Sequence, residues 1–120
     1  ATFSVQAPAP LAFSVGPTTA SPDPVSRGQS VTIGTAVRAT APASGIIVDL
    51  EIYDAQRQRV AQRVFSGQSF AAGQTRGFTW TWPVGANQAM GTYTVKVGIF
   101  NGGWSTLYLW ENAAGAIRVQ

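Results

Sequence analysis

The sequence has no histidine and no cysteine, and a single lysine, Lys96, among its 120 residues. Without cysteine the chain can form no disulfide, offers no thiolate nucleophile and cannot hold a metal ion through sulfur. Charged residues make up only 11% of the chain, which is about half of their usual share in globular proteins. No apolar run is long enough to span a membrane, so no membrane partner is expected. These absences leave few side chains that could carry out catalysis.

The charge that is present is spread along the chain. Seven arginines and one lysine against five acids give a net charge of +3 and a pI near 10. Because the arginines form no cluster, nucleic-acid binding is not predicted. A surface made mostly of Ser, Thr, Gln, Gly and Ala is typical of secreted bacterial modules, so we expect an extracellular location. The absence of an initiator Met and of a signal peptide indicates a mature chain or a piece of a larger protein.

The length suits one domain with a single core. Five of the seven prolines fall in residues 1–28, where we expect a stiff linker and a short edge strand over residues 12–15. Residues 29–120 are predicted to form the folded domain. No segment has the pattern of a helix of useful length.

Apolar and polar residues alternate in most of this domain. The clearest alternation predicts strands over residues 30–39, 46–53 and 92–100, and weaker patterns predict strands over 59–66, 74–83, 104–110 and 116–119. Turn residues separate these segments, as at 42–45 and 101–103, and a loop at 67–73 is expected to turn Phe70 inward. Short strands divided by turns predict an all-β fold, a two-sheet antiparallel β-sandwich.

Two acids lie on one predicted strand. Asp49 and Glu51 are two residues apart, so they share an outward face at roughly 6.5–7 Å along the backbone. Carboxylate pairs at such separations serve glycoside hydrolases. However, exposed acids on a flat strand have neither a cleft nor a raised pKa, so we interpret the pair as a solvated face with Lys96 as counter-charge. If this face binds a ligand, the pair could accept hydrogen bonds from sugar hydroxyls.

The segment 78–82 places Phe78, Trp80 and Trp82 on one strand face. We interpret this face as core, because a sandwich needs large side chains to fill its middle. With the opposite facing, the two indoles would form an exposed ladder for a ligand.

A second aromatic group follows the turn at 101–103. Trp104, Tyr108 and Trp110 alternate with Leu107 and Leu109, so three rings line up in the open if both leucines face inward. Such a row is more apolar surface than a monomer usually exposes without a use. Tyr108 and Trp110 would be about 7 Å apart along the strand, a step comparable with one hexose unit. The alternative is that both tryptophans fold back and cap the open end of the sandwich.

Evidence for a metal or a cofactor is slight. Calcium prefers six or more oxygen ligands from clustered Asp, Asn or Glu, and only Glu111, Asn112 and Asp23 are candidates. No cofactor and no catalytic residue are predicted, and a structural ion in a loop is left open.

Four stretches together resemble a known type of module: VDLEIY at 48–53, FSGQSFAAGQT at 65–75, FTWTW at 78–82 and GTYTVKVGIF at 91–100. They are similar to immunoglobulin-like modules appended to bacterial cellulases. Among these the chain most resembles carbohydrate-binding module family 81, which is attached to an endoglucanase. The resemblance covers roughly residues 30–120.

The resemblance implies an immunoglobulin-like sandwich without activity of its own. It also implies affinity for β-1,4-glucans (cello-oligosaccharides, mixed-linkage glucan, xyloglucan and cellulose) along a flat face, and a covalently linked catalytic domain as partner. From the facing argument we expect the carbohydrate to contact Trp104, Tyr108, Trp110, Tyr53, Glu51 and Asp49, with Trp80, Trp82, Phe100 and Lys96 as secondary candidates. The rival interpretation is a structural spacer or protein-contact module of a secreted enzyme.

Overall fold

The computed structural model describes residues 10–120, and within them every regular element is a β-strand. The strands are β1 (Phe13–Val15), β2 (Thr19–Ser21), β3 (Ser30–Ala39), β4 (Ala43–Tyr53), β5 (Arg59–Phe70), β6 (Thr75–Pro83), β7 (Gly91–Phe100) and β8 (Leu107–Val119). Residues 1–9, part of the predicted linker, lie outside the described residues. The predicted all-β fold is confirmed, and the edge strand expected at 12–15 is β1.

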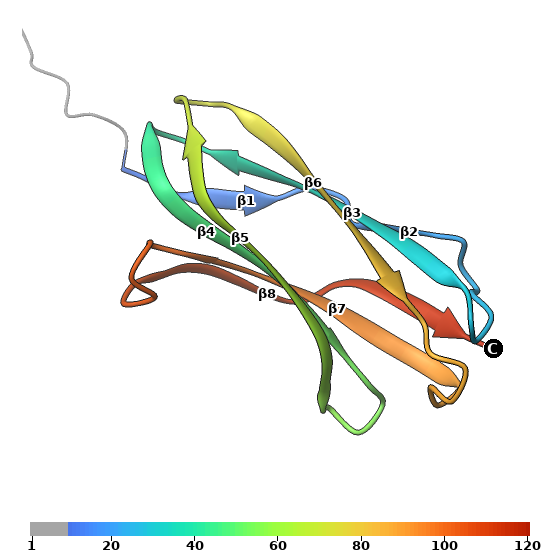
Figure 1. Ribbon diagram of the computed structural model, residues 1–120. Coiled ribbons are helices and arrows are strands. Elements are labelled where there is room, and N and C mark those ends of the chain that lie inside the picture. Colours follow the sequence, from blue (N-terminus) through green and yellow to red (C-terminus); the bar gives the residue numbers. More distant parts are fainter. Residues whose placement is uncertain (1–9) are drawn as a thin grey trace, which may run out of the picture.

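The strands form two sheets that pack face to face (Figure 1). In the first sheet β3 is central, with β6 along one side and with β1 and β2 against successive halves of the other side. The second sheet has the order β5-β4-β7-β8. All neighbouring strands in both sheets are antiparallel, as the sandwich prediction requires.

The segment after β2 joins the two sheets. Val25 forms a parallel bridge with Val119 of β8, and its backbone N–H donates to the carbonyl of Arg118 at 2.8 Å. In return, the Arg118 N–H donates to Asp23 Oδ1 at 3.0 Å. Val25 is fully buried, so this crossing closes the core at the end where β8 finishes.

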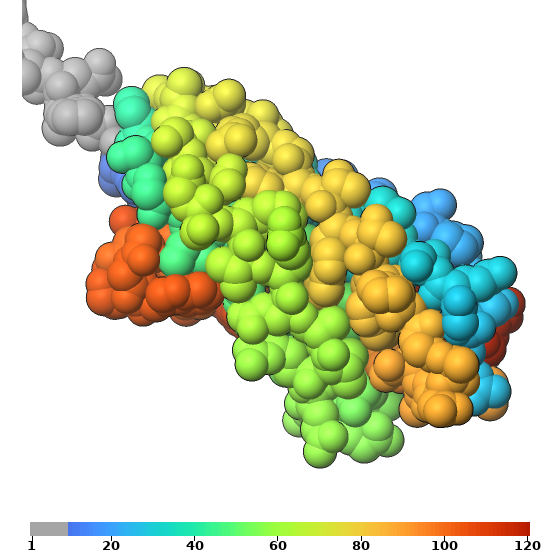
Figure 2. All heavy atoms as spheres, in the orientation of Figure 1, coloured from blue at the N-terminus to red at the C-terminus, as the bar shows by residue number. Residues whose placement is uncertain are grey.

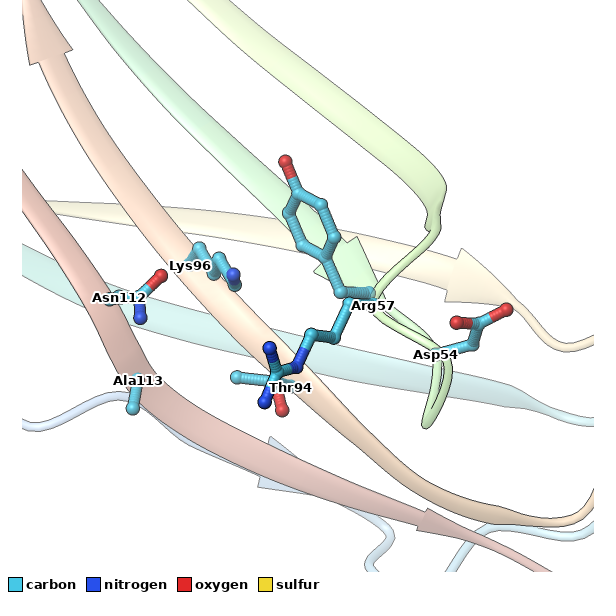
Figure 3. A pocket seen from close by; sticks show the side chains of 7 residues that line it. Asp54, Arg57, Thr94, Lys96, Asn112 and Ala113 are labelled. Atoms are coloured by element: carbon cyan, nitrogen blue, oxygen red, sulfur yellow. The ribbon is translucent and has the colours of Figure 1, made fainter.

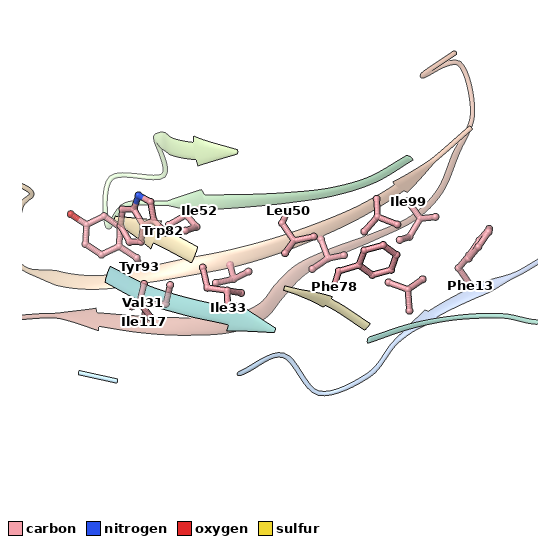
Figure 4. Close-up of a cluster of buried hydrophobic side chains, with 14 of the residues drawn as sticks. Phe13, Val31, Ile33, Leu50, Ile52, Phe78, Trp82, Tyr93, Ile99 and Ile117 are labelled. Atoms are coloured by element: carbon pink, nitrogen blue, oxygen red, sulfur yellow. The ribbon is translucent and has the colours of Figure 1, made fainter. Parts of the chain in front are cut away.

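The core lies between the inner faces of the two sheets (Figure 4). Strand β3 alternates as predicted and buries Val31, Ile33 and Val37, because successive side chains point to opposite faces of a strand. Phe65 of β5 and Phe78 of β6 meet at 5.2 Å between ring centroids, where the side chains of these two strands close one side of the sandwich (Figure 2).

The core interpretation of segment 78–82 is confirmed. Phe78 and Trp82 are buried, and Trp80 is partly buried against the core. The Trp82 indole packs 5.5 Å from the Tyr93 ring, and the Tyr93 hydroxyl donates to the Ala89 carbonyl at 2.6 Å. The two tryptophans of β6 therefore serve the interior rather than an exposed ladder.

Three boundaries differ from the sequence prediction because irregular pairing carries strands through expected breaks. Strand β4 begins at Ala43, inside the turn expected at 42–45, and its register against β5 shifts between Ala43 and Ile46. Strand β5 continues through Gly67, which has a φ of 65°, and the β4–β5 register shifts there by an inserted residue. The expected loop at 67–73 is thus mostly strand, although Phe70 is buried as predicted. Strand β8 begins only at Leu107, so residues 104–106 of the expected strand lie outside it, and it continues without a break to Val119.

We expect Trp82→Ala to lower the free energy of unfolding by about 3–5 kcal/mol, because it removes a large buried ring and leaves a cavity. The matched control is Thr81→Ala, whose exposed side chain lies on the opposite face of the same strand; it should change stability by less than about 0.5 kcal/mol. Urea unfolding of both variants measures the difference. Equal losses from the two substitutions would contradict the burial of Trp82.

Candidate functional site

The side of the second sheet that points away from the core, here called the outer face, collects most of the predicted site residues. Paired residues of antiparallel neighbours share a face, and β7 lies between β4 and β8. The register pairs Asp49 with Gly98 and Glu51 with Lys96, and it pairs Gly98 with Trp110. Asp49, Glu51, Tyr53, Lys96, Phe100 and Trp110 therefore lie on one face, whereas Trp80 and Trp82 belong to the other sheet.

An aromatic cluster, Phe100, Trp104 and Trp110, covers one part of this face. A methyl group at Gly98 would lie 2.8 Å from ring atoms of both Phe100 and Trp110, so these two rings rest directly over the glycine. The Trp104 ring lies 4.8 Å from the Phe100 ring, with the planes inclined at 49°. Trp104 keeps 47% of its surface exposed, which leaves ring surface available to a ligand.

The expected row of Trp104, Tyr108 and Trp110 is wrong at its middle position. Leu109 pairs with Ile99 and packs against the core as predicted, but Leu107 pairs with Phe100, so Tyr108 is an extra residue in a bulge. Its ring packs 5.2 Å from that of Phe13, next to the first sheet, while Leu107 is 53% exposed. Phe100, a secondary candidate from the sequence, takes the place expected for Tyr108.

Asp49 and Glu51, here called the carboxyl pair, are buried on the outer face, with 1% and 5% of their surfaces exposed. The expectation of a solvated pair is therefore wrong. Side chains of neighbouring positions cover it: Gln62 Nε2 donates to Asp49 Oδ1 at 2.9 Å, and the Tyr53 hydroxyl donates to the Glu51 carboxylate. The predicted counter-charge Lys96 does lie opposite Glu51.

The two carboxyls have opposite pKa shifts. Burial, a hydrogen bond to Glu51 and the charge of Glu51 raise the pKa of Asp49 to about 7, against the opposing effects of Gln62 and Arg59. Burial alone would also raise the pKa of Glu51. Hydrogen bonds from Asp49 and Tyr53, together with the charges of Arg59 and Lys96, instead hold it below its usual value. In mildly acidic solution, up to about pH 7, protonated Asp49 thus donates to ionised Glu51, and the pair carries one negative charge.

The same contacts act on Tyr53. Its hydrogen bond to Glu51, followed by burial and the Glu51 charge, raises the pKa of Tyr53 to about 12. The phenol therefore remains a hydrogen-bond donor across the physiological pH range.

A hollow of about 430 Å³ opens beside the carboxyl pair (Figure 3). Its walls include Tyr53, Asp54, Arg57, Thr94, Lys96 and Asn112. The Lys96 ammonium lies 4.2 Å from the centre of the Tyr53 ring, and the Trp110 indole N–H donates to Asn112 Oδ1 at 3.4 Å. Through Asn112 the hollow therefore lies next to the aromatic cluster. The volume is in the range of small-molecule sites, which is about 300–1,000 Å³.

Sequence reasoning did not find Arg57, Thr94 and Asn112 as parts of a binding site. Thr94 could have been found, because it is two residues from Lys96 on the same strand face. Arg57 sits in a turn and Asn112 in the irregular part of β8, between the pairs Val97–Glu111 and Val95–Gly115. Strand alternation does not place either of them.

Two non-glycine residues in the described part of the chain have a left-handed backbone, Arg57 (φ 65°) and Trp104 (φ 59°). Both end hairpin turns: the Arg57 N–H donates to the Asp54 carbonyl at 3.1 Å, and the Trp104 N–H donates to the Asn101 carbonyl at 3.0 Å. This conformation costs a residue with a side chain roughly 1–2 kcal/mol. Both strained residues belong to the outer face, and such strain is often found at functional sites.

Among residues 10–120 no three acidic side chains come together in a way that could hold a metal ion. Of the acids considered for such a role, Asp23 accepts a backbone hydrogen bond from Arg118. The same part of the chain also contains no helix able to cross a membrane.

No protein-family model matches this chain, and no curated protein matches it either. Solved structures do match. The C-terminal domain of wzt superposes with a TM-score of 0.69 at 14% identity, over 90% of this chain and 70% of that one. The CARDB domain of a Pyrococcus furiosus protein in complex with di-metal ions superposes with a TM-score of 0.65 at 15% identity, over 98% and 95%. These likenesses confirm the immunoglobulin-like β-sandwich.

Longer enzymes also contain a similar fold. A β-glucosidase from Listeria innocua in complex with glucose matches with a TM-score of 0.56 at 12% identity, over 91% of this chain but only 16% of the enzyme. A β-glucosidase from Erythrobacter marinus matches with a TM-score of 0.59 at 16% identity, over 92% and 16%. At these identities the likeness concerns the fold alone.

We expect the free energy of unfolding to fall as the pH rises from about 5 to about 8. Asp49 has a pKa of about 7 in the folded chain against an ordinary value of 3.8. The stabilisation that results from its raised pKa is therefore fully present below about pH 4 and is lost as the pH rises through 7. At 1.36 kcal/mol per pKa unit the upper bound of the loss is about 4 kcal/mol. The lowered pKa of Glu51 makes the free energy of unfolding rise with pH, but this opposite effect occurs at lower pH.

Urea unfolding at a series of pH values measures this slope. Asp49→Asn keeps a donor beside Glu51 and should flatten the dependence, whereas Glu111→Gln, a change at an exposed acid, should leave it as in the wild type. A wild-type stability that stays constant between pH 5 and 8 would contradict the protonated pair.

Proposed function

We propose that this chain is a non-catalytic carbohydrate-binding module that holds β-1,4-glucan chains on the outer face. The observation that carries the proposal is the aromatic cluster, which is partly exposed and lies next to a polar hollow. Exposed apolar surface bordered by polar groups is typical of ligand sites. The candidate ligands are those that the sequence resemblance implies: cello-oligosaccharides, mixed-linkage glucan, xyloglucan and cellulose.

The cluster supplies the kind of contact that pyranose rings accept. The C–H groups on the faces of β-linked sugars pack against flat rings such as Trp104 and Trp110. By analogy with nucleobases on aromatic side chains, each stacked ring would contribute on the order of 1–3 kcal/mol. Thr94 and Asn112 at the hollow can exchange hydrogen bonds with hydroxyl groups and so orient the chain. Two or three such contacts give a modest affinity, which is sufficient for a module that keeps a linked enzyme near its substrate.

The carboxyl pair is arranged poorly for hydrolysis. Glycosidases place two carboxyl groups on opposite sides of the scissile bond, about 5–9.5 Å apart. Asp49 and Glu51 are instead hydrogen-bonded to each other, and neighbouring side chains cover them almost completely. The raised pKa of Asp49 therefore results from burial beside another acid, which favours a binding role for the face over a catalytic one.

The β-glucosidase matches support a linked arrangement. In the Listeria innocua enzyme the matching region is 16% of the chain, so a sandwich of this kind occurs within a longer glycosidase polypeptide. We propose that the present module likewise acts in a secreted protein, joined to a catalytic domain. Holding a polysaccharide on the module would raise its effective concentration at the linked active site.

The second candidate function is a spacer or protein-contact module. The exposed leucine Leu107, which pairs with Phe100 of the cluster, favours it. An aliphatic side chain offers a sugar no flat ring and is common in protein contacts. Retention in a polysaccharide gel separates the two functions, since a spacer would migrate unretarded.

We expect Trp110→Ala and Trp104→Ala to lose retardation in affinity electrophoresis through soluble β-glucan gels. Each removes one stacking ring of the cluster and should weaken binding by about 1–3 kcal/mol. Tyr108→Ala is the matched control, because it also deletes a partly exposed ring in the same segment, but one that packs on Phe13. The Tyr108→Ala variant should still be retarded by the β-glucan gel. Circular dichroism checks that all three variants are folded, and unretarded wild-type protein would refute the proposed function.

A further inference from the structure

The hollow beside the aromatic cluster carries two cations and one acid. Arg57 reaches over it from the β4–β5 turn, and Lys96 rises from β7 toward the same space (Figure 3). The acid, Asp54, is occupied by its own turn, because its Oδ1 accepts hydrogen bonds from the backbone N–H groups of Gln56 and Gln58 at 2.9 and 2.8 Å. Its carboxylate therefore stabilises the turn that presents Arg57.

Neither cation of the hollow is in an ion pair. Among residues 10–120 the ion pair of the structure joins Arg59 to Glu51, at 3.7 Å. Glu51 lies across the strand from Lys96, but it is buried and already accepts hydrogen bonds from Tyr53 and Asp49. Because Asp49 keeps its proton to about pH 7, the neighbouring carboxyl pair offsets only one positive charge. Donor groups of Arg57 and Lys96 thus remain available to a ligand.

The backbone at Arg57 indicates that its side chain has a use. A four-residue turn that ends in a left-handed residue is most easily made with glycine, yet the chain has arginine there with a φ of 65°. A guanidinium group fits the two oxygens of a carboxylate with two parallel hydrogen bonds, and a lysine ammonium adds a point charge. Uncharged Thr94 and Asn112 in the same wall suit hydroxyl groups.

We propose that the hollow binds the carboxylate of an acidic sugar, a hexuronate unit within the β-linked chain that the aromatic cluster stacks. This inference rests on the proposed function and narrows its ligand class. The rings would hold neighbouring neutral units, and the link from Trp110 to Asn112 places the hollow next to them on the same face. The module would thereby select chains that carry carboxylate groups over fully neutral glucan.

The test compares two soluble ligands on the intact chain by titration calorimetry: cellopentaose, and cellopentaose in which C6 hydroxymethyl groups are oxidised to carboxylates. A charge-assisted hydrogen bond contributes about 1.5–3 kcal/mol, so the oxidised pentaose should bind about tenfold more tightly or better at low salt. Because exposed charges are screened, this advantage should shrink at about 1 M salt, while the affinity for the neutral pentaose stays unchanged.

Variants assign the preference to the hollow. Arg57→Gln and Lys96→Gln should each remove the advantage of the oxidised pentaose over the neutral one. Arg63→Gln is the matched control: it removes the same charge, but Arg63 pairs with Leu50 and lies over Phe65, on the other side of the sheet. Arg57→Gly should also raise the thermal midpoint while it abolishes the preference, since glycine relieves the strained turn.

The outcomes separate this inference from the proposed function. If the wild type binds both pentaoses equally, or if Arg63→Gln removes the advantage as fully as Arg57→Gln, the hexuronate site is refuted and glucan binding stands. If neither pentaose binds, the proposed function falls and the hexuronate site falls with it.

Discussion

The register of β7 against its two neighbours determines what the outer face can do. It places Gly98 between Asp49 on β4 and Trp110 on β8, and the missing side chain of this glycine leaves room for the Phe100 and Trp110 rings to lie against the strand. It also sets Lys96 opposite Glu51. A shift of one residue would turn all these groups into the core, so one pairing holds both the cluster and the carboxyl pair in place.

Burial of the carboxyl pair in turn controls the charge of that face. Two ionised acids side by side would add negative charge beside the hollow and disfavour anionic ligands. Because the proton remains on Asp49 to about pH 7, only Glu51 is charged, and Arg59 lies 3.7 Å from it. The positive character of the hollow thus depends on the buried side chains of Asp49 and Glu51 beside it.

Sequence patterns predicted those parts of the molecule that depend on regular alternation. The β3 segment and the facing of Phe78 and Trp82 followed from a period of two, since a strand buried on one face leaves that trace. The position of Tyr108 could not be predicted, because a bulge in β8 reverses the alternation without a signal in its own residues. Nor could the burial of Asp49, since Gln62 contacts it from β5, a strand whose register only the folded sheet defines.

The left-handed backbone at Arg57 and Trp104 lowers the stability of the two turns that border the outer face. Glycine would relieve the turns at Arg57 and at Trp104, and the second turn already contains two glycines, Gly102 and Gly103, just before the strained position. The strain is therefore not forced by a chain that lacks glycine. It is confined to the two hairpins that border the hollow and the aromatic cluster, and both strained residues present large side chains there. Glycine would relieve the backbone at either position, while at position 104 it would also remove the ring that packs on Phe100. Because the chain keeps large side chains at both strained positions, this pattern favours a face that binds a ligand.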